Sequence, residues 1–111
     1  MSEGGNATFA KKVDIRGSGY HQIHIAHNVK IGENSIIAGQ VGIAGSSIIG
    51  NNVKIGGQAG ISGHLVIGNN VTIAGKSGVT KNIADNSIIA GFPAKDIKLW
   101  KKEIIRNSLR K

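Results

Sequence analysis

From Ile25 to Val79 an aliphatic side chain occupies every sixth position without interruption. The residue that follows each of these aliphatic residues is Gly, Ala, Ser or Thr. A period of six fits neither an isolated helix nor a hairpin, but it is typical of a solenoid in which each hexapeptide forms one short strand and one corner. The sequence therefore predicts an all-β solenoid of about three to four triangular coils, each built from three hexapeptides.

The same period assigns each residue to a face or a corner. Side chains along a strand alternate in direction, so Ile31 faces the axis and Lys30 faces solvent. Residues eighteen positions apart then lie above one another in neighbouring coils, about 4.8 Å apart. One corner column holds Asn34, Asn52 and Asn70, whose side chains tolerate left-handed backbone and can form amide ladders. We interpret these asparagines as structural.

A second corner holds the candidate functional residues. It consists of His27 and Asn28, then Gly45 with its neighbouring serine, then Gly63 and His64. His27 therefore occupies a column whose next members are glycines, and this exception marks it as a candidate functional residue. In each of three successive coils, the strand on one face of the solenoid has a glycine at its outward position near this corner: Gly42, Gly60 and Gly78.

Glycine packs poorly inside a strand, and its usual reason for being there is the close approach of another backbone or a ligand. We call Gly42, Gly60 and Gly78 the glycine stripe and interpret it as a binding surface for a slender ligand. The other two faces point Ile36, Ile48 and Val66 outward, which indicates contact with a partner, most simply other copies of the chain.

Composition divides the chain into three parts. Residues 1–12 have no period and are expected to form an irregular lead-in, followed by the solenoid over 13–92. In this interpretation Val13 continues the core series and Gly19 interrupts it. Much of the net charge of +8 lies in residues 93–111, where apolar residues recur at helical intervals. This segment is expected to form a basic amphipathic helix that covers the open edge of the last coil, either with a solvated basic face or as a dock for an acidic partner.

The sequence argues against several classes of function. The predicted fold offers no groove-reading element and no aromatic stacking platform for nucleic acid. The chain contains no cysteine, so thiol and disulfide chemistry are excluded. No apolar run has the form of a signal peptide or a membrane span, which leaves at most peripheral membrane contact and favours the cytoplasm.

Five segments resemble one known family: IHIAHNVKIGENS, IAGQVGIAGS, IGGQAGISGHLVIGNNVTI, GVTKNI and AGFPA. In this order they are similar to the C-terminal half of the UDP-3-O-acylglucosamine N-acyltransferases of lipid A biosynthesis, over residues 23–100. The resemblance implies a left-handed parallel β-helix, an exception to the usual right-handed crossover. It also implies a homotrimer with active sites between subunits, in which a 3-hydroxyacyl group passes from acyl carrier protein to the 2-amino group of a UDP-sugar.

The resemblance also assigns roles to individual residues. His27 corresponds to the general base, the Gly45 N–H to an oxyanion donor, and His64 to a residue that assists the oxyanion or the substrate phosphates. The glycine stripe and Asn28 correspond to substrate-binding positions, with the phosphopantetheine arm and acyl chain of the donor lying along the stripe. Lys81 corresponds to a contact with the acidic carrier protein. No cofactor resident on the chain is implied.

Two other classes remain open. Members of the family carry an N-terminal uridine-binding domain that has no counterpart in this sequence, and Tyr20 and His21 replace the family's usual residues before the base. The chain could therefore be a non-catalytic hexapeptide assembly module. A zinc enzyme similar to the γ-type carbonic anhydrases needs three histidines per metal, whereas only His27 and His64 lie in the regular repeat. We predict no metal site, and we interpret His21 and His24 as bystanders.

Overall fold

The computed structural model describes residues 2–3, 7–16 and 23–109. They form a three-sided parallel β-helix followed by one α-helix, so the predicted fold class is confirmed, and its repeat matches that of the left-handed hexapeptide β-helix. Gly19, Tyr20 and His21 lie outside the described residues. The strands are short, mostly two residues, because each hexapeptide must also supply a corner.

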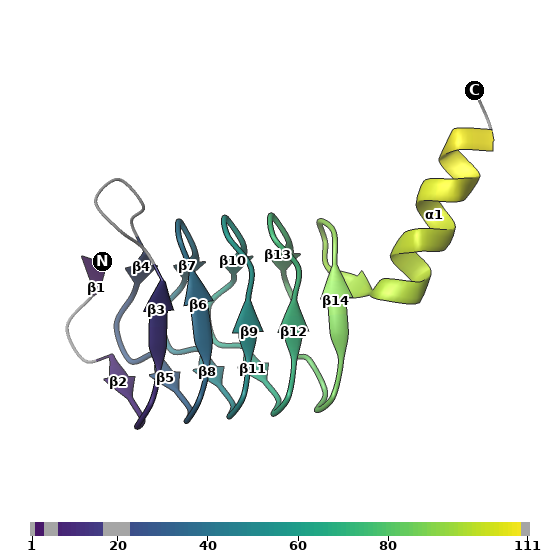
Figure 1. Ribbon diagram of the computed structural model, residues 1–111. Coiled ribbons are helices and arrows are strands. Elements are labelled where there is room, and N and C mark those ends of the chain that lie inside the picture. The colour runs from purple at the N-terminus through teal and green to yellow at the C-terminus, as the bar shows by residue number, and fades with distance from the viewer. Residues whose placement is uncertain (1, 4–6, 17–22, 110–111) are drawn as a thin grey trace.

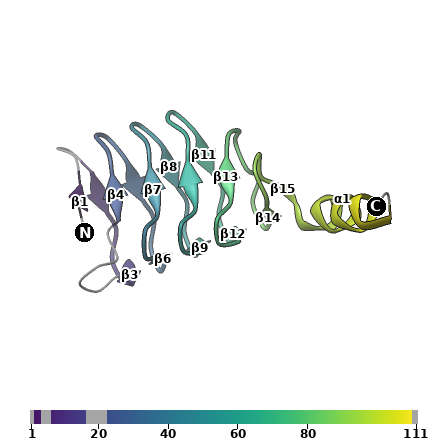
Figure 2. The same ribbon diagram turned by 90° about the horizontal axis from the view of Figure 1, so that it is seen from above.

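Three parallel sheets form the sides of the prism, and successive coils stack along its axis (Figures 1 and 2). The first sheet contains β1 (Ser2–Glu3), β4 (His24–Ile25), β7 (Gly42–Ile43), β10 (Gly60–Ile61) and β13 (Gly78–Val79). The second contains β2 (Thr8–Phe9), β5 (Lys30–Ile31), β8 (Ile48–Ile49) and β11 (Val66–Ile67). The third contains β3 (Asp14–Arg16), β6 (Ile36–Ala38), β9 (Lys54–Ile55), β12 (Thr72–Ile73), β14 (Ile88–Ala90) and β15 (Lys95–Asp96).

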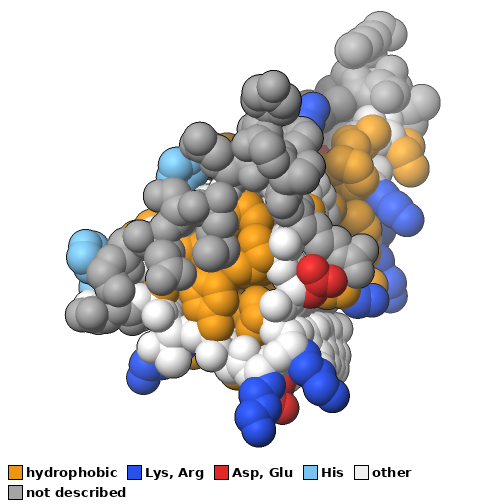
Figure 3. Space-filling view, turned by 60° about the vertical axis from the view of Figure 1, so that its left-hand side comes forward, with side chains coloured by type: hydrophobic (Ala, Val, Ile, Leu, Met, Phe, Trp, Pro, Cys, Tyr) orange, Lys and Arg blue, Asp and Glu red, His pale blue; other side chains and the backbone are white. Residues whose placement is uncertain are grey.

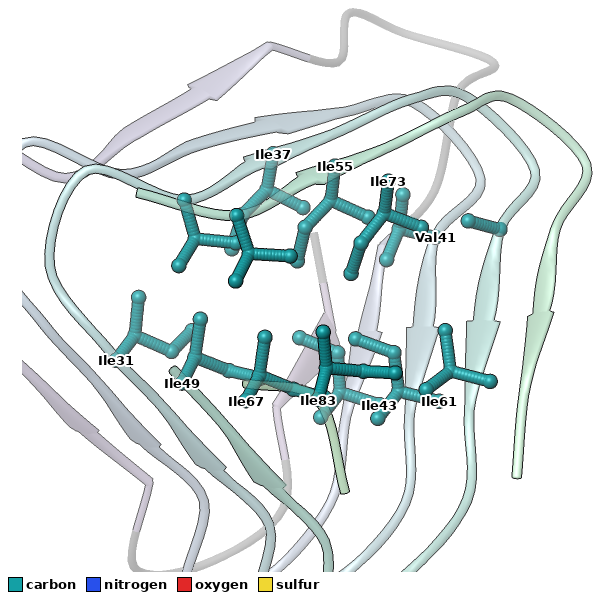
Figure 4. Close-up of a cluster of buried hydrophobic side chains, with 14 of the residues drawn as sticks. Ile31, Ile37, Val41, Ile43, Ile49, Ile55, Ile61, Ile67, Ile73 and Ile83 are labelled. Atoms are coloured by element: carbon teal, nitrogen blue, oxygen red, sulfur yellow. The ribbon is translucent and has the colours of Figure 1, made fainter. Parts of the chain in front are cut away.

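The core is a set of aliphatic columns. Ile37, Ile55 and Ile73 stack along one side of the axis, and each is at most 2 % exposed (Figure 4). Ile31, Ile49 and Ile67 form a second column, which the isolated bridge between Ile67 and Ile83 continues. Where Figure 3 shows the N-terminal end, hydrophobic side chains lie at the centre and charged side chains lie at the lower rim. In every regular coil, therefore, alternate side chains of each strand point toward the axis, as predicted.

Corner residues adopt the left-handed backbone that the asparagine column predicted. From Asn28 to Lys76 a residue with φ near +60° recurs every six positions. Amide side chains then connect the coils, since Gln58 Nε2 donates to Gln40 Oε1 at 2.7 Å. At a neighbouring column the backbone N–H of Asn51 donates to Asn69 Oδ1 at 2.8 Å. The corners thus extend the ladder of hydrogen bonds beyond the strands.

The register differs from the uniform eighteen-residue spacing at both ends. Ile15 pairs with Ile37, and Phe9 with Ile31, so the first coil is longer than the others. Val13 was expected to continue the six-residue core series of Ile25, but Ile15 takes that core position, so this expectation was wrong. The expected lead-in also contributes β1 and β2, which pair with β4 and β5. At the other end Thr72 pairs with Ile88, so the last coil is shorter.

The C-terminal edge is covered by the turn after β14 and by β15, not by the helix. Gly91 O accepts a hydrogen bond from Gly78 N at 2.8 Å, and Ala94 N donates to Gly78 O at 2.6 Å. The third sheet ends in β15, which pairs antiparallel with β14. The α-helix, α1 (Ile97–Leu109), points away from the prism (Figure 1). Helix capping of the last coil was thus a wrong expectation, because the edge groups of a strand need backbone partners that a helix keeps for itself.

The basic helix itself was predicted correctly, although it begins later than residue 93. Asp96 Oδ1 accepts a hydrogen bond from Lys98 N at 2.9 Å at its start, as an N-terminal cap does. Lys95 pairs with Glu103 at 2.8 Å. Trp100 lies against Gly91, where an added Cβ would be 2.7 Å from the indole Cδ1. These contacts attach α1 to the end of the prism.

The close stacking of corners makes a direct test possible. A Cβ at Gly50 would lie 2.5 Å from Asn69 Oδ1 and 2.6 Å from the backbone oxygen of Gly68, and that backbone cannot move without disturbing the next coil. Gly50→Ala is therefore expected to lower the free energy of unfolding by about 1–3 kcal/mol, measured by urea denaturation. At Gly60 nothing lies within 4 Å of the added carbon. Gly60→Ala, the matched control, should change stability by no more than about 0.5 kcal/mol. Equal losses in the two variants would contradict this account of the corner.

Candidate active site

The predicted base and the predicted oxyanion donor lie on adjacent coils. His27 is an exposed corner residue between β4 and β5, and Asn28 beside it has φ +61°. The carbonyl of His27 accepts a hydrogen bond from Ser46 N at 2.8 Å, and the carbonyl of Gly45 accepts one from His64 N at 2.9 Å. The three corners are thus stacked by backbone hydrogen bonds, which hold His27 directly beside Gly45.

The N–H of Gly45 is available to a ligand. At the next corner of the prism, the equivalent N–H groups of Glu33 and Asn51 donate to side-chain oxygens one coil further on. The residue one coil after Gly45 is Gly63, which has no side chain to accept such a bond. Within the described part of the chain, the Gly45 N–H accordingly has no acceptor. Glycine in this column therefore leaves a half-buried backbone donor unused.

The glycine stripe forms the floor of a groove. The strand register aligns Gly42, Gly60 and Gly78 with His24 on the outer face of the first sheet. No atom lies within 4 Å of the Cβ position of Gly42 or Gly60, so the floor there is open. At Gly78 that position is occupied by the ring of Phe92.

The groove has a volume of about 630 Å³ and reaches the corner that carries the candidate chemistry. Its lining includes Ala26, Ala44 and Ser62, which immediately precede His27, Gly45 and Gly63 in the chain. The walls are mostly apolar, with the hydroxyls of Ser62 and Thr80 among the polar groups. An extended apolar chain could therefore lie along the stripe with a reactive group near the corner.

The remaining predicted residues, His64 and Lys81, do not themselves line the groove. His64 is exposed and has φ +59°, one position beyond the column of His27 and Gly45. Lys81 is exposed in the segment after β13, next to Asn82, whose Oδ1 accepts a hydrogen bond from Val66 N at 2.8 Å. Lys81 thus follows directly on Thr80, a lining residue of the groove.

Among the lining residues that the sequence analysis did not identify, two have large side chains. His24, interpreted as a bystander, lines the groove in register with the glycine stripe. The eighteen-residue spacing could have placed it there, because it precedes Gly42 by one coil. Phe92 reaches the groove through the turn between β14 and β15, and no repeat position indicated this.

Two features of the described residues bear on other classes of function. Among the described residues, no group of three or more His, Cys, Asp or Glu side chains is arranged so that it could hold a metal ion. No helix in the described ranges is both long and apolar enough to cross a membrane.

Comparison with known proteins first identifies the class of repeat. Residues 46–81 match the family model for the bacterial transferase hexapeptide (six repeats). More particularly, the chain is 58 % identical over 83 residues to the UDP-3-O-acylglucosamine N-acyltransferase of Desulfotalea psychrophila. The match covers 75 % of this chain, and the resemblance inferred from the motifs is thereby confirmed. The chain spans about a quarter of that relative, since the match covers 24 % of its length.

Solved structures support the same class. Serine acetyltransferase from Neisseria gonorrhoeae superposes with a TM-score of 0.75 at 26 % identity, over 82 % of this chain and 39 % of its own. UDP-N-acetylglucosamine O-acyltransferase from Moraxella catarrhalis superposes with a TM-score of 0.66 at 27 % identity, over 91 % of this chain and 47 % of its own. The curated relative and both of these neighbours are acyltransferases, as the motif resemblance implied.

Proposed function

We propose that this chain forms the catalytic β-helix of a homotrimeric, cytoplasmic N-acyltransferase of lipid A biosynthesis. It would move a 3-hydroxyacyl group from acyl carrier protein to the 2-amino group of UDP-3-O-acylglucosamine. The observation that carries the proposal is the open groove over the glycine stripe, which ends beside a corner where His27 and the free N–H of Gly45 are one coil apart. The acceptor is inferred from the name of the curated relative.

The chemistry follows from these groups. The acceptor amine attacks the thioester carbonyl of the acylated phosphopantetheine, which forms the C–N bond and places negative charge on the carbonyl oxygen. The Gly45 N–H donates a hydrogen bond to this oxyanion, and His64 assists it or holds a substrate phosphate. His27 removes the proton from the amine, a task that suits the imidazole group near neutral pH. Collapse of the intermediate breaks the C–S bond, and the proton held by His27 can pass to the departing thiolate.

The first experiment asks whether the chain is an enzyme or an assembly module. Single-turnover transfer from acylated carrier protein to UDP-3-O-acylglucosamine should be measured with the purified chain, alone and with a uridine-binding domain added. Transfer in either mixture supports the proposal. Its absence from both, with folded and oligomeric protein, would favour the non-catalytic hexapeptide module instead.

Removal of the base should affect the chemical step. His27→Ala is expected to lower kcat by about 10²- to 10⁴-fold, the usual contribution of a positioned general base, with little change in KM for the carrier protein. His64→Ala should lower kcat less. Circular dichroism and light scattering on both variants control for folding and assembly. A kcat unchanged in His27→Ala would remove His27 from the mechanism.

A charge reversal should affect carrier binding without affecting chemistry. Lys81→Glu replaces an exposed cation near the groove with an anion, so KM for the acidic carrier should rise about two- to fivefold. Single-turnover rates at saturating carrier should stay near those of the unmodified chain. The matched control is Lys76→Glu, which makes the same change at another exposed corner. If both variants raise KM equally, the effect is one of net charge and not of a contact at Lys81.

The proposed trimer makes a further prediction. Ile48 and Val66 on the second sheet are 43 % and 49 % exposed in the single chain, as their outward positions predicted. If they pack against a neighbouring subunit, Ile48→Glu would bury an unpaired carboxylate and dissociate the assembly. Light scattering should then show a trimer for the unmodified chain and a smaller species for this variant, with Lys76→Glu as the control that stays trimeric. A monomeric unmodified chain would exclude an active site between subunits.

A further inference from the structure

His24 is placed in the groove by the strand to which it belongs. Ile25 beside it is 2 % exposed and faces the axis, so the alternation along β4 turns the His24 side chain outward. His24 N donates to Val41 O at 2.9 Å, which holds this strand against the next coil. The imidazole group therefore stands on the floor of the groove, in register with the glycine stripe and at its N-terminal end.

The imidazole group of His24 is exposed and unpaired. Within the part of the chain that the structure describes, it has no hydrogen-bond partner. Its neighbour on the next coil is Gly42, and no atom lies within 4 Å of the Cβ position there. Among the described residues that line the groove, His24 also carries the only ionisable side chain. A ligand in the groove can therefore reach both ring nitrogens.

Polar side chains are distributed unevenly along the groove. On the coils of His27 and Gly45, where acyl transfer is proposed to occur, His24 is the only lining residue with a polar side chain. The hydroxyls of Ser62 and Thr80 lie one and two coils further on, which is about 5 and 10 Å along the axis. A polar substituent close to the reacting carbonyl would consequently meet His24 and not these hydroxyls.

We infer that His24 binds the 3-hydroxyl group of the donor acyl chain, so that the groove prefers 3-hydroxyacyl donors to unsubstituted ones. This inference rests on the proposed function, because it takes the acyl thioester as the occupant of the groove. His24 precedes His27 by three residues, so their Cα atoms are at most about 11 Å apart. The length of the imidazole side chain, the two bonds from the carbonyl carbon to C3 and the hydrogen bonds at either end span such a gap.

The two groups are matched in their hydrogen bonding. A neutral imidazole has one N–H donor and one acceptor nitrogen, and a hydroxyl group both donates and accepts, so either tautomer of His24 can pair with it. An unsubstituted acyl chain offers no such partner at the same place. One hydrogen bond in a partly open groove is expected to change the preference between the two donors by about three- to tenfold.

Three substitutions at His24 separate hydrogen bonding from size. His24→Ala removes the ring, His24→Phe keeps a ring without polar atoms, and His24→Gln keeps one donor and one acceptor group. Because the side chain is exposed, these changes should leave the fold intact. The matched control is Lys54→Ala, which truncates an exposed outward residue of β9 on the third sheet, away from the groove lining.

The measurement is single-turnover transfer from carrier protein loaded with a 3-hydroxyacyl or an unsubstituted acyl group of equal length. Binding of the corresponding acyl-pantetheine thioesters to the full chain is measured in parallel. The unmodified chain and Lys54→Ala should prefer the 3-hydroxyacyl donor. This preference should fall about three- to tenfold in His24→Ala and His24→Phe, and His24→Gln should retain most of it.

The outcomes separate the inference from the function on which it rests. A preference that His24→Ala leaves unchanged, in protein that transfers, overturns the inference but not the proposed function. A preference in binding that depends on His24, without any transfer, supports the inference and counts against the proposed reaction. If no thioester binds or reacts with any variant, both fail. Circular dichroism checks folding, and if His24→Ala does not fold, the comparison of His24→Phe with His24→Gln decides in the same way.

Discussion

The whole structure depends on one interaction, the parallel pairing of each short strand with its equivalent in the next coil. A two-residue strand cannot persist alone, but each strand of the regular coils, from β4 to β13, pairs with strands of the neighbouring coils and contributes an aliphatic side chain to a continuous column. The inward isoleucines are almost completely buried because their counterparts above and below cover them. Residues at one position of the repeat therefore share one environment, and this places His27, Gly45 and Gly63 in a single column.

The sequence predicts those features of the fold that are set within a single hexapeptide, and it does not predict those that depend on contacts between distant parts of the chain. The core columns, the left-handed corners and the outward positions of Ile48 and Val66 follow from the period of six, since each is set by a residue's place in its own hexapeptide. Both end coils depart from that period, and their register depends on how extra or missing residues are accommodated. The eighteen-residue spacing could have placed His24 beside the glycine stripe, but His24 was interpreted as a bystander because it lies at the start of the repeat.

The position of Phe92 could not have been predicted from the repeat. It depends on where the chain turns after β14 and on two hydrogen bonds to Gly78, which are tertiary contacts with no periodic signature. The same limit explains why α1 was expected to cover the last coil. The sequence indicates a helix there, but only the pairing of β15 with β14 shows that the edge is already closed. Lys98, Lys101 and Lys102 consequently lie exposed on a helix that extends beyond the prism (Figure 1).

The constant spacing of the coils has a consequence for how such a groove can evolve. Its floor is built from one residue per coil, so inserting or deleting eighteen residues would leave every column, corner and hydrogen-bond partner of the same kind as before. The groove would gain or lose one whole strand spacing, about 4.8 Å. The backbone can therefore change the length of the groove only in whole strand spacings. A smaller change in groove length requires a side chain that fills part of one spacing.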